Sequence, residues 1–154
     1  MSQLFDAQAV AAATGGRLVR AGPSGPVVTD SRALKAGDWF VALVGPRFDG
    51  HDYVAAADGA GAAGCVVERE LPGTAGLVVV PDTTRALQDL GRAARAAFTG
   101  PVVGLTGSSG KTTTRALCAL ALSPLGRVHQ TTGNLNNHLG VPLTLLARPD
   151  DAAA

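Results

Sequence analysis

The sequence has few aromatic residues and few lysines, and its positive and negative charges nearly cancel. Its 154 residues include four phenylalanines, one tryptophan, one tyrosine and two lysines, and the net charge is +1. A nucleic-acid-binding surface needs clustered basic side chains and, for single strands, aromatic rings on which bases stack. The composition offers little of either, so we expect no nucleic-acid partner.

Cysteines and long apolar runs are also scarce. Cys65 and Cys118 each stand alone in an apolar setting, which is typical of small core residues in a reducing compartment. No run approaches the roughly 20 apolar residues that a transmembrane helix needs. The first residues, MSQLFDAQAV, lack the charged and apolar regions of an export signal. We therefore expect a cytoplasmic monomer without a membrane span.

Short apolar runs alternate with helical patterns along the chain. The predicted strands are 27–29, 39–44, 65–67, 77–80 and 102–105. The predicted helices are a short one between Asp6 and Gly15, one opening within 52–60, one over 83–98 capped by Asp82, one over roughly 111–122, and one with Pro142 near its first turn. This alternation predicts an α/β architecture with mostly parallel strands. The break at Thr99-Gly100-Pro101 predicts two domains, 1–98 and 99–154.

The stretch GLTGSSGKTTTR at 104–115 combines a glycine-rich loop with the start of a predicted helix. Glycines let the backbone approach a ligand closely, and N–H groups at a helix start favour an anion. The residues predicted to bind the phosphates of ATP are Gly107, Ser108, Ser109, Gly110, Lys111, Thr112 and Thr113. Among them, Lys111 would contact the β- and γ-phosphates and Thr112 would ligate Mg²⁺, the two catalytic roles. The alternative is a Gly/Ser turn that only caps a helix.

A second polar cluster lies at 131–137. Asparagine amides offer both donors and an acceptor, so they can hold a polar ligand. The candidate substrate-binding residues here are Thr132, Asn134, Asn136 and Asn137. The alternative is an Asn-rich turn whose side chains bond to their own backbone.

Three ordered motifs resemble those of the Mur ligase family. They are DSR at 30–32 followed by GDWFVAL at 37–43 and DGHDY at 49–53, then GSSGKTTT at 107–114, then TGNLNNHLGVPLTLL at 132–146. The family uses the short loop G-x-x-G-K-T, which accounts for Leu105 at the place of the first glycine in the longer pattern. The asparagine block and the Ser-Ser pair favour the member that joins D-alanyl-D-alanine to UDP-N-acetylmuramoyl-tripeptide. The alternative is the sister ligase that adds the third peptide residue.

The resemblance implies a first α/β domain that binds the UDP-sugar, followed by the first strand–loop–helix–strand unit of a parallel-sheet ATPase domain. In such ligases ATP phosphorylates the tripeptide carboxylate, and the amine of D-alanyl-D-alanine then attacks the acyl phosphate. The resemblance also implies UDP-sugar contacts by Ser31, Arg32, Phe48, Asp49, Gly50 and His51. Two alternatives remain open. Residues 30–32 could be a turn with a local ion pair, and His51 could cap the helix near Asp52.

Members of this family are longer, three-domain proteins. The resemblance therefore implies that an acidic Mg²⁺ ligand and a third domain lie outside these 154 residues. We expect the chain by itself to be inactive as a ligase, and a non-catalytic UDP-sugar-binding module is the alternative function.

Overall fold

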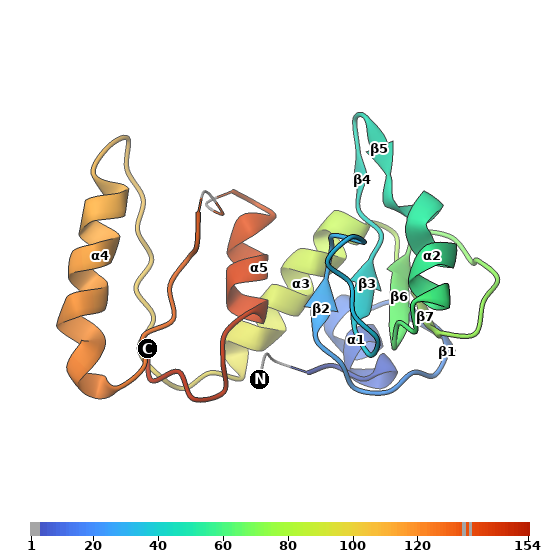
Figure 1. The fold of residues 1–154 in the computed structure, drawn as a ribbon, viewed down its shortest axis with the longest axis horizontal. Helices are drawn as coiled ribbons and strands as arrows, with labels where there is room; N and C mark the ends of the chain where they lie inside the picture. Colours follow the sequence, from blue (N-terminus) through green and yellow to red (C-terminus); the bar gives the residue numbers. More distant parts are fainter. Residues whose placement is uncertain (1–3, 134, 136) are drawn as a thin grey trace.

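A five-stranded sheet between two helical layers forms the larger part of the molecule (Figure 1). The computed structural model describes residues 4–133, 135 and 137–154. The strand order is β1-β7-β6-β3-β2, with β1 (Arg17–Arg20), β2 (Val27–Val28), β3 (Trp39–Val41), β6 (Gly64–Val67) and β7 (Gly76–Val79). All neighbours pair in parallel except β1, which is antiparallel at one edge. The predicted α/β architecture with a mainly parallel sheet is confirmed.

The strands bury both faces, because successive side chains of a strand point to opposite sides. Trp39, Val41, Val66 and Val78 belong to one core, which helices α1 (Ala7–Thr14) and α3 (Thr83–Ala96) cover. Phe40, Cys65, Val67 and Leu77 belong to the other, against α2 (Val54–Gly59). The buried position of Cys65 agrees with the prediction that it is a core residue.

Helices α1 and α3 begin where their capping residues predict. The carboxylate of Asp6 accepts a hydrogen bond from the N–H of Ala9 at 2.8 Å, and that of Asp82 accepts one from the N–H of Arg85 at 2.8 Å. Helix α1 ends at Gly15, whose φ of 65° lies in the left-handed region that glycine adopts readily. These boundaries therefore follow from local sequence.

The second part of the chain contains α4 (Lys111–Leu122), the 3₁₀ turn η2 (Ser123–Leu125) and α5 (Gly140–Leu146), as predicted for both α-helices. The prediction of a buried strand over 102–105 is wrong. Val102, Val103 and Leu105 are 48%, 52% and 38% exposed, and no strand of the described residues pairs with this segment. After α4, the β-pairing of the described residues is limited to an isolated bridge between Arg127 and Ala152. Strand backbone needs a neighbouring strand for its hydrogen bonds, and none lies beside this run.

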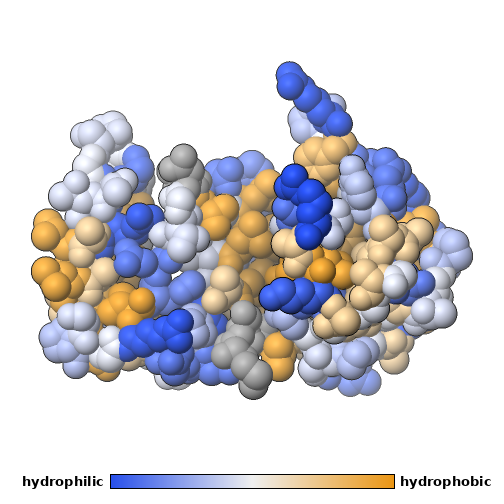
Figure 2. Space-filling model, in the orientation of Figure 1, coloured by the Kyte–Doolittle hydropathy of each residue, from blue (hydrophilic) through white to orange (hydrophobic). Residues whose placement is uncertain are grey.

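Apolar side chains are also exposed on α4 (Figure 2), where Leu117 and Leu120 are 60% and 70% exposed. None of the α4 residues is buried. No helix in the described ranges is both long and apolar enough to cross a lipid bilayer.

Helix α5 packs on α3, so the two parts of the chain are in direct contact (Figure 1). Leu146 is 2% exposed and belongs to the same core cluster as Leu87 and Leu90 of α3. The helices approach closely at Gly91, where a Cβ would lie 2.8 Å from the Cα of Pro142. The core of the first part therefore extends into residues that follow the Thr99–Pro101 break.

Candidate functional site

Two neighbouring parallel strands, β2 and β3, end beside a cavity of about 400 Å³. The turn at 29–32 follows β2, while the hairpin of β4 (Val44–Gly45) and β5 (Phe48–Asp49) and the 3₁₀ turn η1 (Gly50–Tyr53) follow β3. Ligands of open parallel sheets bind outside the carboxyl ends of the strands. The lining residues are Thr29, Asp30, Ser31, Arg32, Phe40, Leu43, Phe48, Gly50 and Tyr53.

Four of the predicted substrate residues line this cavity: Ser31, Arg32, Phe48 and Gly50. The structure adds Tyr53, which the sequence analysis did not select. Phe48 and Tyr53 are 53% and 48% exposed, so both rings are accessible to a ligand. Tyr53 ends the DGHDY motif, and an aromatic residue next to a predicted binding loop is the signal that could have identified it.

Arg32 is held by Asp30, another lining residue that the sequence analysis did not select as a ligand contact. Nε of Arg32 donates to Oδ1 of Asp30 at 2.9 Å, and Nη2 donates to Oδ2 at 2.7 Å. This side-chain pairing with Arg32 lowers the pKa of Asp30 to about 2. The alternative of a turn with a local ion pair is thus observed, and the same turn lines the cavity.

His51 and Asp49 do not line the cavity. The His51 side chain is fully buried, with Nδ1 2.5 Å from Oδ1 of Asp49, while Nε2 accepts the N–H of Glu68 at 2.8 Å. Both ring nitrogens therefore have partners within the protein, and the ring holds the loop in place. The contact of His51 with substrate stays a prediction. The backbone N–H of His51 and then its ring lower the pKa of Asp49 to about 2, with a further contribution from Arg69.

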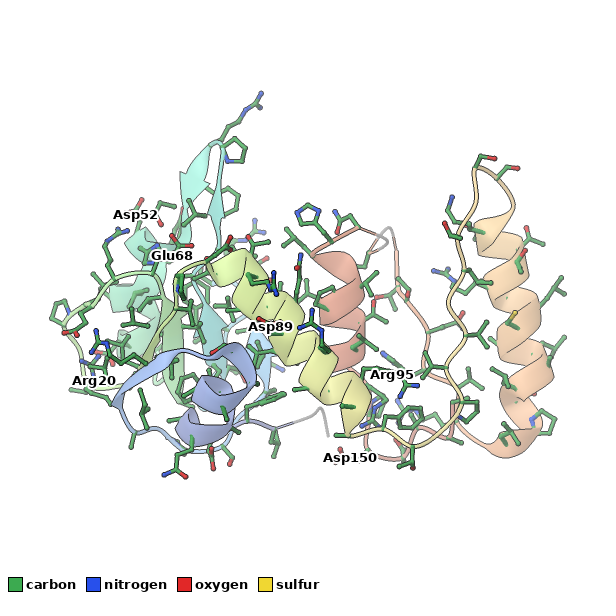
Figure 3. The ribbon with its side chains drawn as sticks, turned by 180° about the vertical axis from the view of Figure 1, so that it is seen from behind. Arg20, Asp52, Glu68, Asp89, Arg95 and Asp150 are labelled. Carbon is green, nitrogen blue, oxygen red and sulfur yellow. The ribbon has the colours of Figure 1, made fainter. Side chains whose placement is uncertain are left out.

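The same network reaches α3. The carboxylate of Glu68 accepts the backbone N–H of Thr83 at 2.9 Å and its hydroxyl at 3.0 Å. Figure 3 shows Glu68 beside the first turn of α3. A carboxylate at this end of a helix also interacts favourably with the helix dipole. The loop that carries Phe48 is therefore tied to α3 through His51 and Glu68.

The glycine-rich loop before α4 has the backbone geometry that an anion site needs. Gly107 and Gly110 have φ values of 147° and 76°, and Gly110 is the N-cap of α4. The backbone N–H of Thr114 donates to the carbonyl of Gly110, whereas those of residues 111–113 have no acceptor among the described residues. Free N–H groups at a helix start attract an anion. Ser108 and Ser109 are exposed on the same loop.

Lys111 and Thr112 stand at the start of α4, as predicted. The ammonium of Lys111 donates to the carbonyl of Gly107, so it lies across the loop, while Thr112 and Thr113 are exposed. Ammonium, amide and hydroxyl groups together match the oxygens of a nucleotide phosphate. In the described ranges no group of three or more His, Cys, Asp or Glu side chains could hold a metal ion. The Thr112 hydroxyl is the side-chain oxygen predicted to ligate Mg²⁺ here, and it is exposed at the start of α4.

A second cavity, of about 390 Å³, lies between α4, residues 101–105, residues 128–133 and α5. Lys111, Thr112 and Arg115 line it together with mainly apolar side chains, and no Asp or Glu side chain of the described residues does. Nη1 of Arg115 donates to the carbonyl of Thr131 at 2.6 Å, which joins α4 to the start of the polar cluster at 131–137. Arg115 follows Lys111 by four residues and so shares its face of the helix; that spacing could have identified it.

The asparagine cluster is described only in part, because Asn134 and Asn136 lie outside the described residues. Oδ1 of Asn137 accepts the backbone N–H groups of Leu139 at 3.1 Å and Gly140 at 2.7 Å. This is the alternative in which an asparagine bonds to nearby backbone. Thr132 is exposed. The β4–β5 hairpin, the segment before α5 and the loop before α4 all lie along one edge of the molecule, the upper edge in Figures 1 and 3.

Two family models match the chain. The Mur ligase family, catalytic domain, matches residues 26–95, and the Mur ligase middle domain matches residues 105–154. The chain belongs to the Mur ligase family. The resemblance seen in the three sequence motifs is thereby confirmed.

Two similar relatives carry the name UDP-N-acetylmuramoyl-tripeptide--D-alanyl-D-alanine ligase. The chain is 45% identical to the Synechocystis sp. protein over 128 residues, which is 81% of the chain and 28% of that protein. It is 43% identical to the Bacillus subtilis protein over 128 residues, with the same coverage. The chain thus spans little more than a quarter of the length of these relatives.

Two solved structures of the family have a fold similar to that of this chain. The chain matches MurF from Acinetobacter baumannii with a TM-score of 0.91 at 38% identity, over 99% of the chain and 35% of that protein. It matches MurF from Thermotoga maritima, solved in complex with ADP, with a TM-score of 0.75 at 36% identity, over 84% of the chain and 30% of that protein.

Proposed function

We propose that this chain is the UDP-sugar-binding and phosphate-binding portion of an ATP-dependent ligase that joins D-alanyl-D-alanine to UDP-N-acetylmuramoyl-tripeptide. One observation carries the proposal. The cavity at the ends of β2 and β3 and the glycine-rich loop before α4 occupy one edge of the molecule, in a chain 45% identical to a relative of that name. In this proposal the substrates and ATP are cytoplasmic metabolites, as the expected cytoplasmic location of the protein requires.

The first cavity has the groups that a uridine diphosphate needs. The exposed rings of Phe48 and Tyr53 can pack against the uracil, since aromatic rings stack on nucleobases. Ser31 supplies a hydroxyl for the ribose or the diphosphate, and Arg32 supplies a planar cation suited to phosphate oxygens. Gly50 lets η1 approach the residues that follow β3, because a Cβ there would lie 2.7 Å from backbone atoms of Ala42 and Leu43.

The glycine-rich loop would hold the phosphates of ATP. Lys111 and the N–H groups of residues 111–113 would bind phosphate oxygens, and Thr112 would bind Mg²⁺. Bound ATP supplies the phosphoryl group that activates the tripeptide carboxylate for attack by the amine of D-alanyl-D-alanine. The residues of this chain bind and orient these groups, which is the main contribution a protein makes to phosphoryl transfer.

A second candidate function is binding without turnover. It is favoured because none of the described residues that line the cavity beside Lys111 and Thr112 has a carboxylate side chain. Phosphoryl-transfer sites of this type hold the metal with an acidic side chain as well as a hydroxyl. We therefore propose that the 154-residue chain, taken alone, binds the UDP-sugar and does not ligate.

Isothermal titration calorimetry with UDP-N-acetylmuramoyl-tripeptide tests the proposed function. The wild-type chain should bind, and a variant with both Ser31→Ala and Arg32→Ala should lose most of its affinity. Ser108→Ala, in the loop before α4, serves as the matched control and should bind the UDP-sugar as the wild type does. An unchanged affinity in the double variant would show that the sugar nucleotide binds elsewhere.

A further inference from the structure

Asp30 engages only one edge of the Arg32 guanidinium. That edge consists of Nε, 2.9 Å from Oδ1, and Nη2, 2.7 Å from Oδ2. Nη1 has no acceptor among the described residues, and a guanidinium carries five N–H groups in a fixed plane. The adjacent edge, formed by Nη1 and the second hydrogen of Nη2, therefore remains free for a second bidentate partner. Phosphate oxygens match that geometry.

The ion pair also fixes where this free edge lies. The Arg32 side chain is 88% exposed, so little packing restrains it. Oδ1 of Asp30 accepts the backbone N–H of Arg32 at 3.0 Å as well, which joins the carboxylate to the turn and the side chain at once. Both residues line the cavity beside Phe48 and Tyr53.

We infer that Asp30 is a positioning residue, which holds Arg32 so that the free edge of its guanidinium meets the diphosphate of the sugar nucleotide. This inference rests on the proposed function of the cavity. An arginine that is already oriented loses less rotamer freedom when the ligand binds, so affinity rises.

An opposing effect comes from the charge of Asp30. Arg32 lowers the pKa of Asp30 to about 2, so the carboxylate is ionised at neutral pH and repels a diphosphate. That repulsion acts through water at an exposed site and is screened by salt, with a Debye length of about 8 Å at physiological ionic strength. A bidentate, charge-assisted contact depends on orientation at short range and is the stronger of the two effects. Positioning should therefore outweigh repulsion.

Calorimetry with two probes, UDP and uridine, separates these effects on the 154-residue chain. Asp30→Ala should weaken UDP binding by about three- to tenfold while uridine binding stays unchanged, because only UDP has the phosphates that Arg32 contacts. In an Arg32→Ala background, Asp30→Ala should cause no further loss of UDP affinity. Asp30→Asn, which keeps one acceptor oxygen and the size of the side chain, should give a smaller loss than Asp30→Ala. Thermal melting of each variant checks its fold. If Asp30→Ala is unfolded, the UDP and uridine affinities of Asp30→Asn provide the test instead.

Each other outcome overturns the inference in a distinguishable way. Tighter UDP binding by Asp30→Ala means that repulsion dominates. An equal loss for UDP and uridine means that Asp30 only maintains the turn. Wild-type binding of UDP with no change in either Asp30 variant removes this role and leaves the proposed function intact. A wild-type chain that binds neither probe removes both.

Discussion

The backbone N–H of Glu68 donates to Nε2 of His51 at 2.8 Å, and this bond makes Nε2 the accepting nitrogen of a fully buried imidazole. Because Nε2 is an acceptor, the hydrogen of the neutral ring is on Nδ1, which faces the carboxylate of Asp49. The ring thus joins the end of β6 to the loop that follows β5. Without the ring, the carboxylate of Asp49 and the N–H of Glu68 would each lose a hydrogen-bond partner.

Replacing His51 should therefore lower the stability of the protein. His51→Ala leaves the N–H of Glu68 without its acceptor and removes a buried ring, so the free energy of unfolding should fall by about 2–4 kcal/mol. Urea denaturation followed by circular dichroism measures the change. His138→Ala is the matched control, because residue 138 is exposed and should change stability by less than about 0.5 kcal/mol. Equal midpoints for the two variants would contradict the role of the buried ring.

The stability should depend on pH through Asp49. Its folded pKa is lowered to about 2, first by the backbone N–H of His51, against about 3.9 for an unfolded aspartate. The unfolded chain therefore takes up the proton first, and the contribution of Asp49 is complete above about pH 5 and is lost as the pH falls from about 4 toward 2. The difference in urea midpoint between the wild type and Asp49→Asn should be large at pH 6 and small near pH 2. A difference that grows as the pH falls would have the wrong sign.

Lys111 should contact the phosphates of ATP and should make no contribution to UDP binding. Lys111→Ala should weaken the binding of ATP with Mg²⁺ by about tenfold or more, because a charge-assisted contact is lost, and should leave UDP binding unchanged. The other lysine of the chain, Lys35, provides the control: Lys35→Ala should bind ATP as the wild type does. Calorimetry on both variants makes the comparison, and an equal loss in both would indicate a non-specific charge effect.

The 154-residue chain should not catalyse ligation. No Asp or Glu side chain of the described residues lines the cavity beside Lys111 and Thr112, so the metal shell would stay incomplete. The chain is incubated with ATP, Mg²⁺, UDP-N-acetylmuramoyl-tripeptide and D-alanyl-D-alanine, and phosphate release is followed. Substrate-dependent release above that of Lys111→Ala would show that these residues form a working enzyme.

Close packing of α5 on α3 should make Gly91 sensitive to a single methyl group. Gly91→Ala places a Cβ 2.8 Å from the Cα of Pro142 and should lower the free energy of unfolding by about 1–3 kcal/mol. Gly59→Ala is the matched control, since a Cβ at that position of α2 meets no atom within 4 Å; it should be neutral or stabilising by up to about 1 kcal/mol. Thermal melting of the two variants gives the comparison, and a neutral Gly91→Ala would mean that α5 moves aside easily.

Features set by nearby residues were predictable from the sequence. The caps at Asp6 and Asp82, and the glycine-rich loop that opens α4, each depend on a few neighbouring residues. The continuous apolar run at 39–44 likewise predicts a strand, and the structure forms β3 over Trp39–Val41 with both faces buried. These signals are local, so the structure reproduces them.

Features that depend on distant residues were not predictable. Residues 102–105 are as apolar as a buried strand, yet they form none because no strand pairs with them among the described residues. The environment of His51 depends on Glu68, 17 residues away, so its motif alone did not reveal that the ring is buried.

Helix α3 is held at two points, at Thr83 by the carboxylate of Glu68 and at Gly91 by Pro142. One residue inserted between these points would turn the second by about 100° around the axis and move it by about 1.5 Å. The position facing Pro142 would then carry a side chain, and the segments on the α5 side would be displaced relative to the β4–β5 hairpin. The number of residues between 83 and 91 therefore sets the spacing between the β4–β5 hairpin and the segments that pack on the α5 side of the molecule.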